Sequence, residues 1–107
     1  MKWILNSAVI SAGAYGTYEY APATREDLRA FLAGGDAISR IGYAETAEVI
    51  ERWTGFRPAL SREVSPLEPG DEAMVVRLRY RVEPGRKGAP VAASDADWEI
   101  ARLTRRS

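Results

Sequence analysis

The chain has 107 residues, 46% of them hydrophobic and 28% charged, and its 15 basic and 15 acidic side chains balance to zero net charge. These values are typical of one globular domain, spanning residues 1–107, and they exclude a global field that would attract nucleic acid. Cysteine and histidine are absent. Disulfides and thiolate chemistry are therefore excluded, as is the side chain that most often binds metals or transfers protons near neutral pH.

The sequence also leads to expectations about cofactors and cellular location. Without histidine or cysteine we expect no metal and no other cofactor. The apolar run near the N-terminus is too short to cross a bilayer and does not have the pattern of a signal peptide. We therefore expect a cytoplasmic protein with no membrane partner.

The first third of the chain alternates between strand and helix patterns. Residues 2–11 are apolar and predict a buried first strand, and residues 17–20 alternate like a second strand that Pro22 stops. Thr24 and Asp27 form a capping box that predicts a helix to about residue 32. Two glycines then end that helix.

The middle of the chain predicts a second helix. Residues 39–43 have the pattern of a connector, and residues 44–54 then carry apolar side chains at helical spacing, with Gly55 as the C-cap. A short strand is predicted over residues 59–64, followed by a turn at residues 67–71.

The last part of the chain predicts two more strands. Residues 74–82 form a strand rich in arginine, residues 86–93 form a loop, and residues 98–103 form an edge strand that closes the sheet. The predicted fold class is therefore α/β of the α+β kind, with one small mixed β-sheet flanked by helices in a single domain.

Three arginines occupy alternate positions in the arginine-rich strand, which is the most informative pattern in the chain. Arg77, Arg79 and Arg81 would share one face of a strand, at spacings of roughly 6.5–7 Å. That spacing is close to the repeat of an extended nucleotide backbone, and arginine binds phosphate oxygens through two parallel hydrogen bonds. An alternative interpretation is a solvated face whose arginines pair with carboxylates on neighbouring strands.

A second group of candidates lies before the second helix and in the first strand. Tyr43 follows Gly42 at a point where the first amide groups of the helix lack backbone partners and favour an anion. A tyrosine there could hydrogen-bond a phosphate or donate a proton to a leaving oxygen, although packing at the rim of the sheet is its commoner role. Asn6 and Ser7 interrupt an apolar strand, so they either find backbone partners or face a ligand.

Four segments of the chain carry a resemblance to a known family, namely residues 3–10, 16–20, 39–47 and 67–73. Together they resemble the viral type III anti-CRISPR ring nucleases and their cellular relatives. The resemblance extends to about Gly85, and its central motif is Ile-Gly-His-x-x-Thr-Ala in that family.

The resemblance implies a fold, a ligand and a reaction. The family forms homodimers of mixed sheets flanked by helices, and it binds cyclic oligoadenylate, typically cyclic tetra-adenylate, across the dimer. It opens the ring without metal, by attack of a ribose 2′-hydroxyl on the adjacent phosphate, which leaves a 2′,3′-cyclic phosphate. Removal of this second messenger silences the CRISPR effectors that it activates. No binding of long nucleic acid is expected.

The resemblance also assigns roles to individual residues. Asn6 would contact the ligand, Arg62 would grip a phosphate, and Arg77 would take the place of a polar ligand contact. Arg81 would lie beside the scissile phosphate, and Tyr43 stands where the family has its catalytic histidine. Some members of the family have a glutamate that assists the reaction. Pro84 takes the place of this glutamate here, and Glu83 stands one position earlier. The other predicted ligand contacts are Ser7, Gly42, Thr46 and Arg79.

The tyrosine leaves several outcomes open. The favoured one is slow metal-independent cleavage, with Tyr43 as the acid and Arg81 stabilising the transition state. The protein could instead hold the ring without cleaving it, as a sponge, or accept a different cyclic nucleotide. A further alternative is a protein that does not bind cyclic nucleotides, namely a small module that binds single-stranded RNA or a protein partner through the arginine face.

Overall fold

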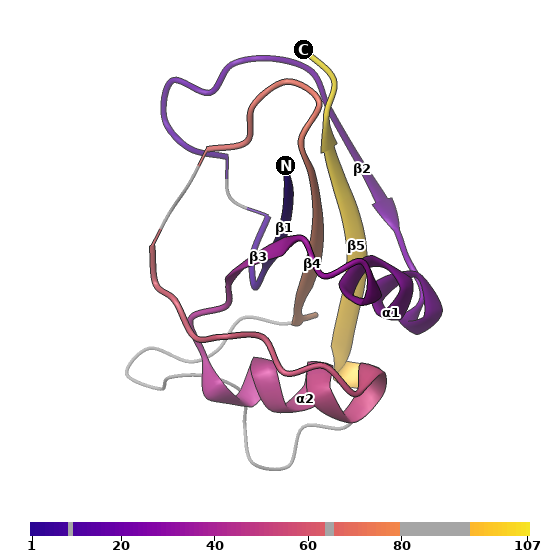
Figure 1. The fold of residues 1–107 in the computed structure, drawn as a ribbon. Coiled ribbons are helices and arrows are strands. Elements are labelled where there is room, and N and C mark those ends of the chain that lie inside the picture. Colours follow the sequence, from indigo (N-terminus) through magenta and orange to yellow (C-terminus); the bar gives the residue numbers. More distant parts are fainter. Residues whose placement is uncertain (9, 64–65, 80–94) are drawn as a thin grey trace.

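The computed structural model describes residues 1–8, 10–63, 66–79 and 95–107, and within them the chain forms one five-stranded sheet (Figure 1). Its strands are β1 (Lys2–Leu5), β2 (Tyr18–Pro22), β3 (Ala37–Arg40), β4 (Glu72–Leu78) and β5 (Trp98–Arg105). Their spatial order is β2-β5-β4-β1-β3. Strand β1 runs parallel to β3 and β4, whereas β5 runs antiparallel to β4 and β2, so the sheet is mixed.

Two helices, α1 (Arg25–Ala33) and α2 (Ala44–Thr54), follow β2 and β3 respectively. The predicted capping box opens α1, because the Thr24 hydroxyl accepts from the Asp27 amide at 3.1 Å and the Asp27 carboxylate accepts from the Thr24 amide at 3.0 Å. Helix α2 ends at Gly55, which adopts a left-handed conformation with φ of 81°. Neither of these helices combines the length and the apolar character needed to cross a bilayer. Both helix predictions are confirmed.

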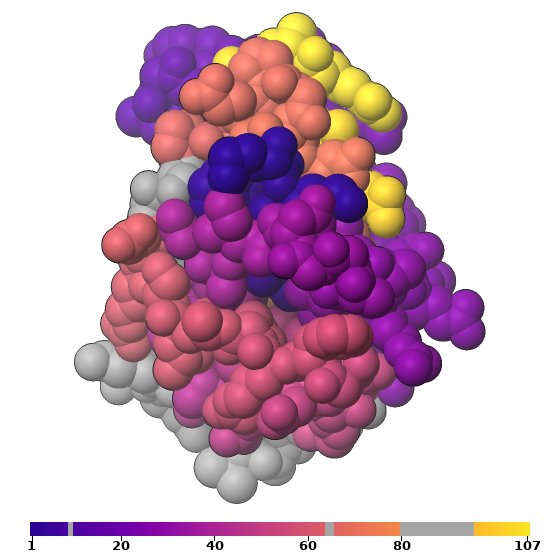
Figure 2. All heavy atoms as spheres, viewed as in Figure 1, coloured from indigo at the N-terminus to yellow at the C-terminus, as the bar shows by residue number. Residues whose placement is uncertain are grey.

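Both helices pack against the same face of the sheet, which we call the helix-covered face (Figure 1). With all atoms drawn in the same view, residues of the two helices cover the centre and lower part of this face (Figure 2). The opposite face carries a separate, smaller apolar cluster around Trp3, Val75 and Leu103, to which Leu67 adds from outside the strands. The main core residues between helices and sheet are Ile4, Leu28, Phe31, Ala47, Ile50, Met74, Val76 and Trp98.

The central strand β4 is buried on both faces along most of its length. Residues 73–76 are each inaccessible to solvent, and they alternate between the two apolar clusters. The sequence predicted an apolar face and an arginine face for this strand. The arginine face in fact begins only at Arg77, because Ala73 and Val75 on the same side belong to the second cluster. The mixed sheet and two helices confirm the predicted α+β class.

Several predicted boundaries were wrong, chiefly at the ends of the first two strands. Strand β1 ends at Leu5 rather than at residue 11, so the two polar residues after it lie outside the sheet. Strand β2 includes Pro22, which was predicted to stop it. Proline is accommodated there because β2 is an edge strand and Pro22 is its last residue, paired with Ala101.

Other corrections concern which segments belong to the sheet. Part of the predicted connector is strand β3, which forms the second edge beside β1. In place of the predicted strand at residues 59–64, residues 59–63 make one isolated bridge, from Leu60 to Ile41. Strand β5 is not an edge, because it lies between β2 and β4. The predicted loop at residues 86–93 and the end of the arginine strand, with Arg81, lie outside the described residues.

Candidate functional site at the start of helix α2

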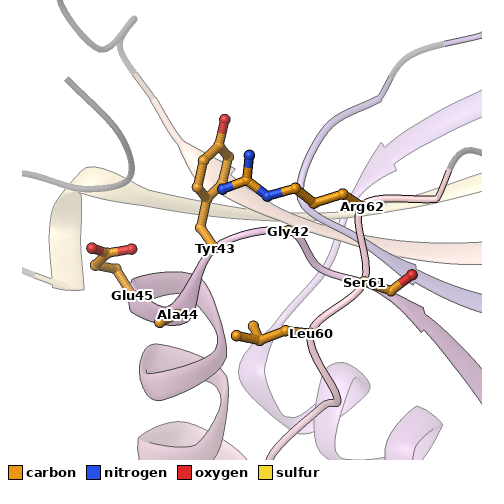
Figure 3. Close-up of a pocket in the computed structure, with 7 residues that line it drawn as sticks. All are labelled: Gly42, Tyr43, Ala44, Glu45, Leu60, Ser61 and Arg62. Carbon is orange, nitrogen blue, oxygen red and sulfur yellow. The ribbon is translucent and has the colours of Figure 1, made fainter. Parts of the chain in front are cut away.

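A cavity of about 380 Å³ opens where the chain leaves strand β3 and enters helix α2 (Figure 3). One wall is the turn into the helix, and the other is a segment about twenty residues further along the chain. The residues that line the cavity are Gly42, Tyr43, Ala44, Glu45, Leu60, Ser61 and Arg62.

Backbone pairing holds the two walls together. Ile41 extends the line of β3 by one residue and forms a parallel bridge with Leu60. The Ser61 amide donates to the Ile41 carbonyl oxygen at 2.8 Å. Ile41 is itself fully buried in the main core, so the position of the second wall is tied to the packing of the helices. The arginine that follows, Arg62, is thereby brought beside the start of α2.

Asn6 fixes the turn from the side of strand β1. Its side-chain oxygen accepts a hydrogen bond from the Gly42 amide at 3.2 Å. Gly42 also has a steric role, since a Cβ atom there would lie 3.3 Å from Cγ of Arg62 and 4.0 Å from the Asn6 oxygen. A side chain at this position would crowd Arg62 and would be in ordinary van der Waals contact with Asn6. Asn6 therefore acts on the site through the backbone of the turn.

Tyr43 and Arg62 contact each other across the cavity. The guanidinium carbon of Arg62 lies 5.4 Å from the centre of the Tyr43 ring, within the range of a cation–π contact. Figure 3 shows the arginine side chain reaching across from the far wall to lie beside the ring. The ring of Tyr43, which carries a phenolic hydroxyl that can give up a proton, thus lies next to a permanent positive charge.

The start of α2 adds a weaker positive potential to this cavity. Tyr43 is the N-cap residue but makes no side-chain capping bond, and amide groups at a helix start attract anions. Glu45, in the first turn, lines the same cavity and opposes an anion there. Over the described part of the chain, no three acidic side chains come close enough together to hold a metal ion.

Three of the candidates from the sequence, Gly42, Tyr43 and Arg62, line this cavity, and Asn6 supports it through its hydrogen bond with the Gly42 amide. Thr46 does not line it, because its residue is only 4% exposed and it faces the interior of the protein rather than the cavity. Ser7 follows Asn6 and is exposed, but it does not line the cavity either.

Arg77 forms an ion pair with Glu99 on the neighbouring strand β5. Its Nε donates to the Glu99 carboxylate at 3.0 Å, and its guanidinium lies 5.8 Å from the ring centre of Tyr20. The hydrogen bond to Glu99 raises the pKa of Arg77, and burial raises the pKa of Tyr20 despite the nearby arginine. For Arg77, the alternative interpretation of a cross-strand ion pair is therefore confirmed.

Arg79 lies away from the Tyr43 cavity as well. Its Nε donates to the carbonyl oxygen of Ala96 at 3.1 Å, and it borders a second cavity that also contains Trp53, near the C-terminal end of α2. Arg79 and Tyr43 therefore line two different cavities. Arg81, the predicted transition-state arginine, is outside the part of the chain that the structure describes.

Sequence reasoning missed four of the residues that line the cavity. Ala44 and Glu45 were predicted only as part of the second helix, and Leu60 and Ser61 as part of a short strand. Their place depends on the bridge between Ile41 and Leu60, which joins segments that are distant in sequence. No local pattern in the chain signals that pairing.

Comparisons with known proteins place these features in a family. A model of the family described as STIV B116-like matches residues 2–95. Among solved structures, B116 of Sulfolobus turreted icosahedral virus matches with a TM-score of 0.70 and 18% sequence identity, over 97% of this chain and 98% of that chain. No curated protein matches the chain. At this level of identity the structural match shows a shared fold.

Proposed function

This chain belongs to the STIV B116-like family, and we propose that it is a ring nuclease that binds cyclic oligoadenylate and opens the ring without metal. The observation that carries the proposal is the contact between Tyr43 and Arg62 beside a turn held by Asn6. A proton donor and a phosphate-binding cation are adjacent there, which is what this reaction needs from a protein. The motif resemblance to ring nucleases adds the identity of the ligand.

In the proposed binding step, Arg62 grips one phosphate of the ring. Its guanidinium can form two parallel hydrogen bonds with phosphate oxygens, and the start of α2 adds attraction for the same anion. Asn6 keeps the Gly42 turn in position, so that the ligand meets a preformed surface. Cyclic tetra-adenylate is the ring we expect.

In the proposed reaction, a ribose 2′-hydroxyl attacks the adjacent phosphorus and the 5′-oxygen leaves. The hydroxyl of Tyr43 donates its proton to the leaving oxygen, and solvent accepts the proton of the 2′-hydroxyl. The products are a 2′,3′-cyclic phosphate and a 5′-hydroxyl, and the tyrosine regains its proton from water. Arg81 is proposed to share with Arg62 the stabilisation of the charged transition state.

We further propose that two copies of the chain share one ring. The Tyr43 cavity of one chain has a volume of about 380 Å³, which is small for a ring of four nucleotides. A symmetric dimer would place two such cavities around the perimeter of one ligand. Calorimetry should then give one ring bound per two chains.

The direct test is to incubate the protein with cyclic di- to hexa-adenylates and separate the products by chromatography. We expect a linear product ending in a 2′,3′-cyclic phosphate, with the same yield in EDTA. Tyr43→Phe should slow cleavage with little loss of binding, and Arg81→Ala should abolish cleavage. Equal rates for Tyr43→Phe and the parent would remove the tyrosine as acid, and strong inhibition by EDTA would overturn the metal-free mechanism.

Arg62→Ala supplies the test of the binding step. We expect it to weaken ring affinity by roughly tenfold or more, because it removes a charge-assisted hydrogen bond to phosphate. Arg57→Ala is the matched control, since Arg57 is an exposed arginine paired with Glu51 and does not line this cavity. Equal affinities for the two variants would contradict the assignment of Arg62.

A sponge that holds the ring intact is the second candidate. The presence of Tyr43 at the position of the family's histidine favours it, because a phenol is the weaker acid. Stoichiometric binding with no product after long incubation would establish the sponge. The alternative function, binding of single-stranded RNA through three arginines of one strand, is weakened because one of them, Arg77, is already paired with Glu99.

A further inference from the structure

The cavity beside Tyr43 has an apolar side that takes no part in the proposed reaction. Leu60 and Ala44 line this cavity together with Tyr43 and Arg62. Figure 3 shows Leu60 and Ala44 at the lower side of the cavity, and the Tyr43 hydroxyl and the Arg62 guanidinium at the upper side. The cavity therefore offers apolar contacts on one side, and the proton donor and phosphate-binding cation of the proposed reaction on the other.

Leu60 is 55% exposed, although leucine is among the residue types that are most often buried. Single apolar side chains on a surface are common and by themselves indicate no function. Leu60 differs from the other large apolar side chains that are exposed in the described part of the chain, because it alone lines this cavity. Its position beside the proposed phosphate contact makes it a candidate for a ligand contact.

Backbone contacts hold Leu60 in place without the help of its side chain. Leu60 forms the parallel bridge with Ile41, and the amide of the next residue, Ser61, donates to the Ile41 carbonyl oxygen at 2.8 Å. One residue before Leu60, the carbonyl oxygen of Ala59 accepts a hydrogen bond from the Ser39 hydroxyl. The leucine side chain is therefore a preformed apolar surface, and it can be shortened without loss of these contacts.

The spacing of Leu60 and Arg62 suits the two ends of one nucleotide. In a strand, residues two positions apart share a face at roughly 6.5–7 Å, which is comparable to the distance between the phosphate and the base of a nucleotide. Leu60 and Arg62 both line the cavity, whereas Figure 3 shows the hydroxyl of Ser61, between them, pointing away from Tyr43. A phosphate held by Arg62 would thus leave its base near Leu60.

We propose that Leu60 contacts a base of the bound ring, and that this contact makes the site select purine rings over pyrimidine rings. The proposal rests on the ring nuclease function proposed above and concerns the same cavity. Leu60 packs against the flat face of the base, and Ala44 extends the apolar surface. A purine has two fused rings and buries more apolar surface against an alkyl side chain than a pyrimidine does. The cavity volume of about 380 Å³ is near the small end of ligand sites, which suits one nucleotide of the ring.

The test measures the affinities for cyclic tetra-adenylate and cyclic tetra-uridylate by calorimetry and compares their ratio between variants. We expect the parent to prefer the adenylate ring. Leu60→Ala should weaken binding of the adenylate ring roughly three- to tenfold, because apolar contact area is lost, and it should weaken binding of the uridylate ring less. The preference for adenylate should therefore fall. Leu60→Met keeps an apolar side chain of similar volume and should retain the preference of the parent.

Two further variants serve as controls. Arg62→Ala removes a phosphate contact that both rings share, so it should weaken both by the same factor and leave the preference unchanged. Phe56→Ala is the matched apolar control, because Phe56 is 42% exposed a few residues before Leu60 but does not line this cavity. It should bind both rings as the parent does.

The results distinguish failure of the base contact from failure of the ring nuclease function. If the parent binds cyclic tetra-adenylate but Leu60→Ala weakens both rings equally, or weakens neither, then Leu60 does not contact the base, and ring binding still stands. Equal affinities of the parent for the two rings would likewise overturn the selection of purines alone. A parent that binds neither ring would overturn the ring nuclease function and the base contact together.

Discussion

Gly42 and Arg62 are in such close contact that a single methyl group would disturb them, since a Cβ atom at Gly42 would lie 3.3 Å from Cγ of Arg62. The backbone at Gly42 does not have a positive φ, so alanine can adopt its conformation. We predict that Gly42→Ala folds normally but displaces Arg62 from Tyr43. Its affinity for cyclic tetra-adenylate, measured by calorimetry, should fall several-fold, with a melting temperature close to that of the parent.

A double-mutant cycle checks the cause of that loss. If Gly42→Ala acts through the arginine, adding it to Arg62→Ala should produce little further change in affinity. Losses that simply add would show that the glycine acts on the ligand by another route.

Glu45 places a negative charge in a cavity that we propose binds phosphate. We predict that Glu45→Gln raises ring affinity up to about fivefold, because a repulsion on the order of 1 kcal/mol is removed. The same change should cost the protein about 0.3–1 kcal/mol of stability, since the carboxylate favours the start of α2. Glu48→Gln is the control, because Glu48 is exposed on the same helix but does not line the cavity. If Glu45→Gln binds the ring with unchanged affinity, the phosphate does not lie in this cavity.

Arg77 is expected to matter little for ring binding. Its side chain is 41% exposed and its charge is paired with Glu99, whose side chain is 29% exposed. We predict that Arg77→Gln lowers the free energy of unfolding by less than about 1 kcal/mol, as for other partly exposed ion pairs. Its ring affinity should stay well above that of Arg62→Ala. A loss of ring affinity in Arg77→Gln larger than that in Arg62→Ala would show that Arg77 contacts the ligand.

Asp71 should make stability depend on pH in the acid range. Burial alone would raise its pKa, but hydrogen bonds from the Met1 amino group, the Glu68 amide and the Trp3 indole together lower it. A carboxylate with a lowered pKa stabilises the fold above its ordinary value of 3.8, and that stability is lost as pH falls through the lower folded-state value.

Asp71→Asn tests this dependence. It keeps the shape of the side chain and removes the charge, and it should cost about 1–3 kcal/mol at pH 7 in urea unfolding. The difference between variant and parent should shrink when unfolding is repeated below pH 3.8. A difference that stays constant with pH would mean that the charge of Asp71 does not contribute.

Helix α2 and its neighbourhood show how far the sequence could be interpreted. Its bounds, Ala44–Thr54, were predicted correctly from apolar spacing and from Gly55, both of which act within one or two turns. Strand β3 precedes this helix, and the sequence predicted a connector over the second half of the strand, because four residues of mixed polarity give no periodic signal. Strand β5 was predicted in nearly the right place but at the wrong position in the sheet.

The sequence by itself determined the α+β class, both helices and the two residues, Gly42 and Tyr43, that begin the candidate site, because capping and periodicity are local properties. Only the tertiary structure decided which arginine reaches that site. Pairing of Ile41 with Leu60 brings Arg62 to Tyr43, whereas the strand register gives Arg77 to Glu99. Strand pairing joins residues that are far apart in the chain, and its register is selected by burial on both faces of the sheet, which no short segment encodes alone.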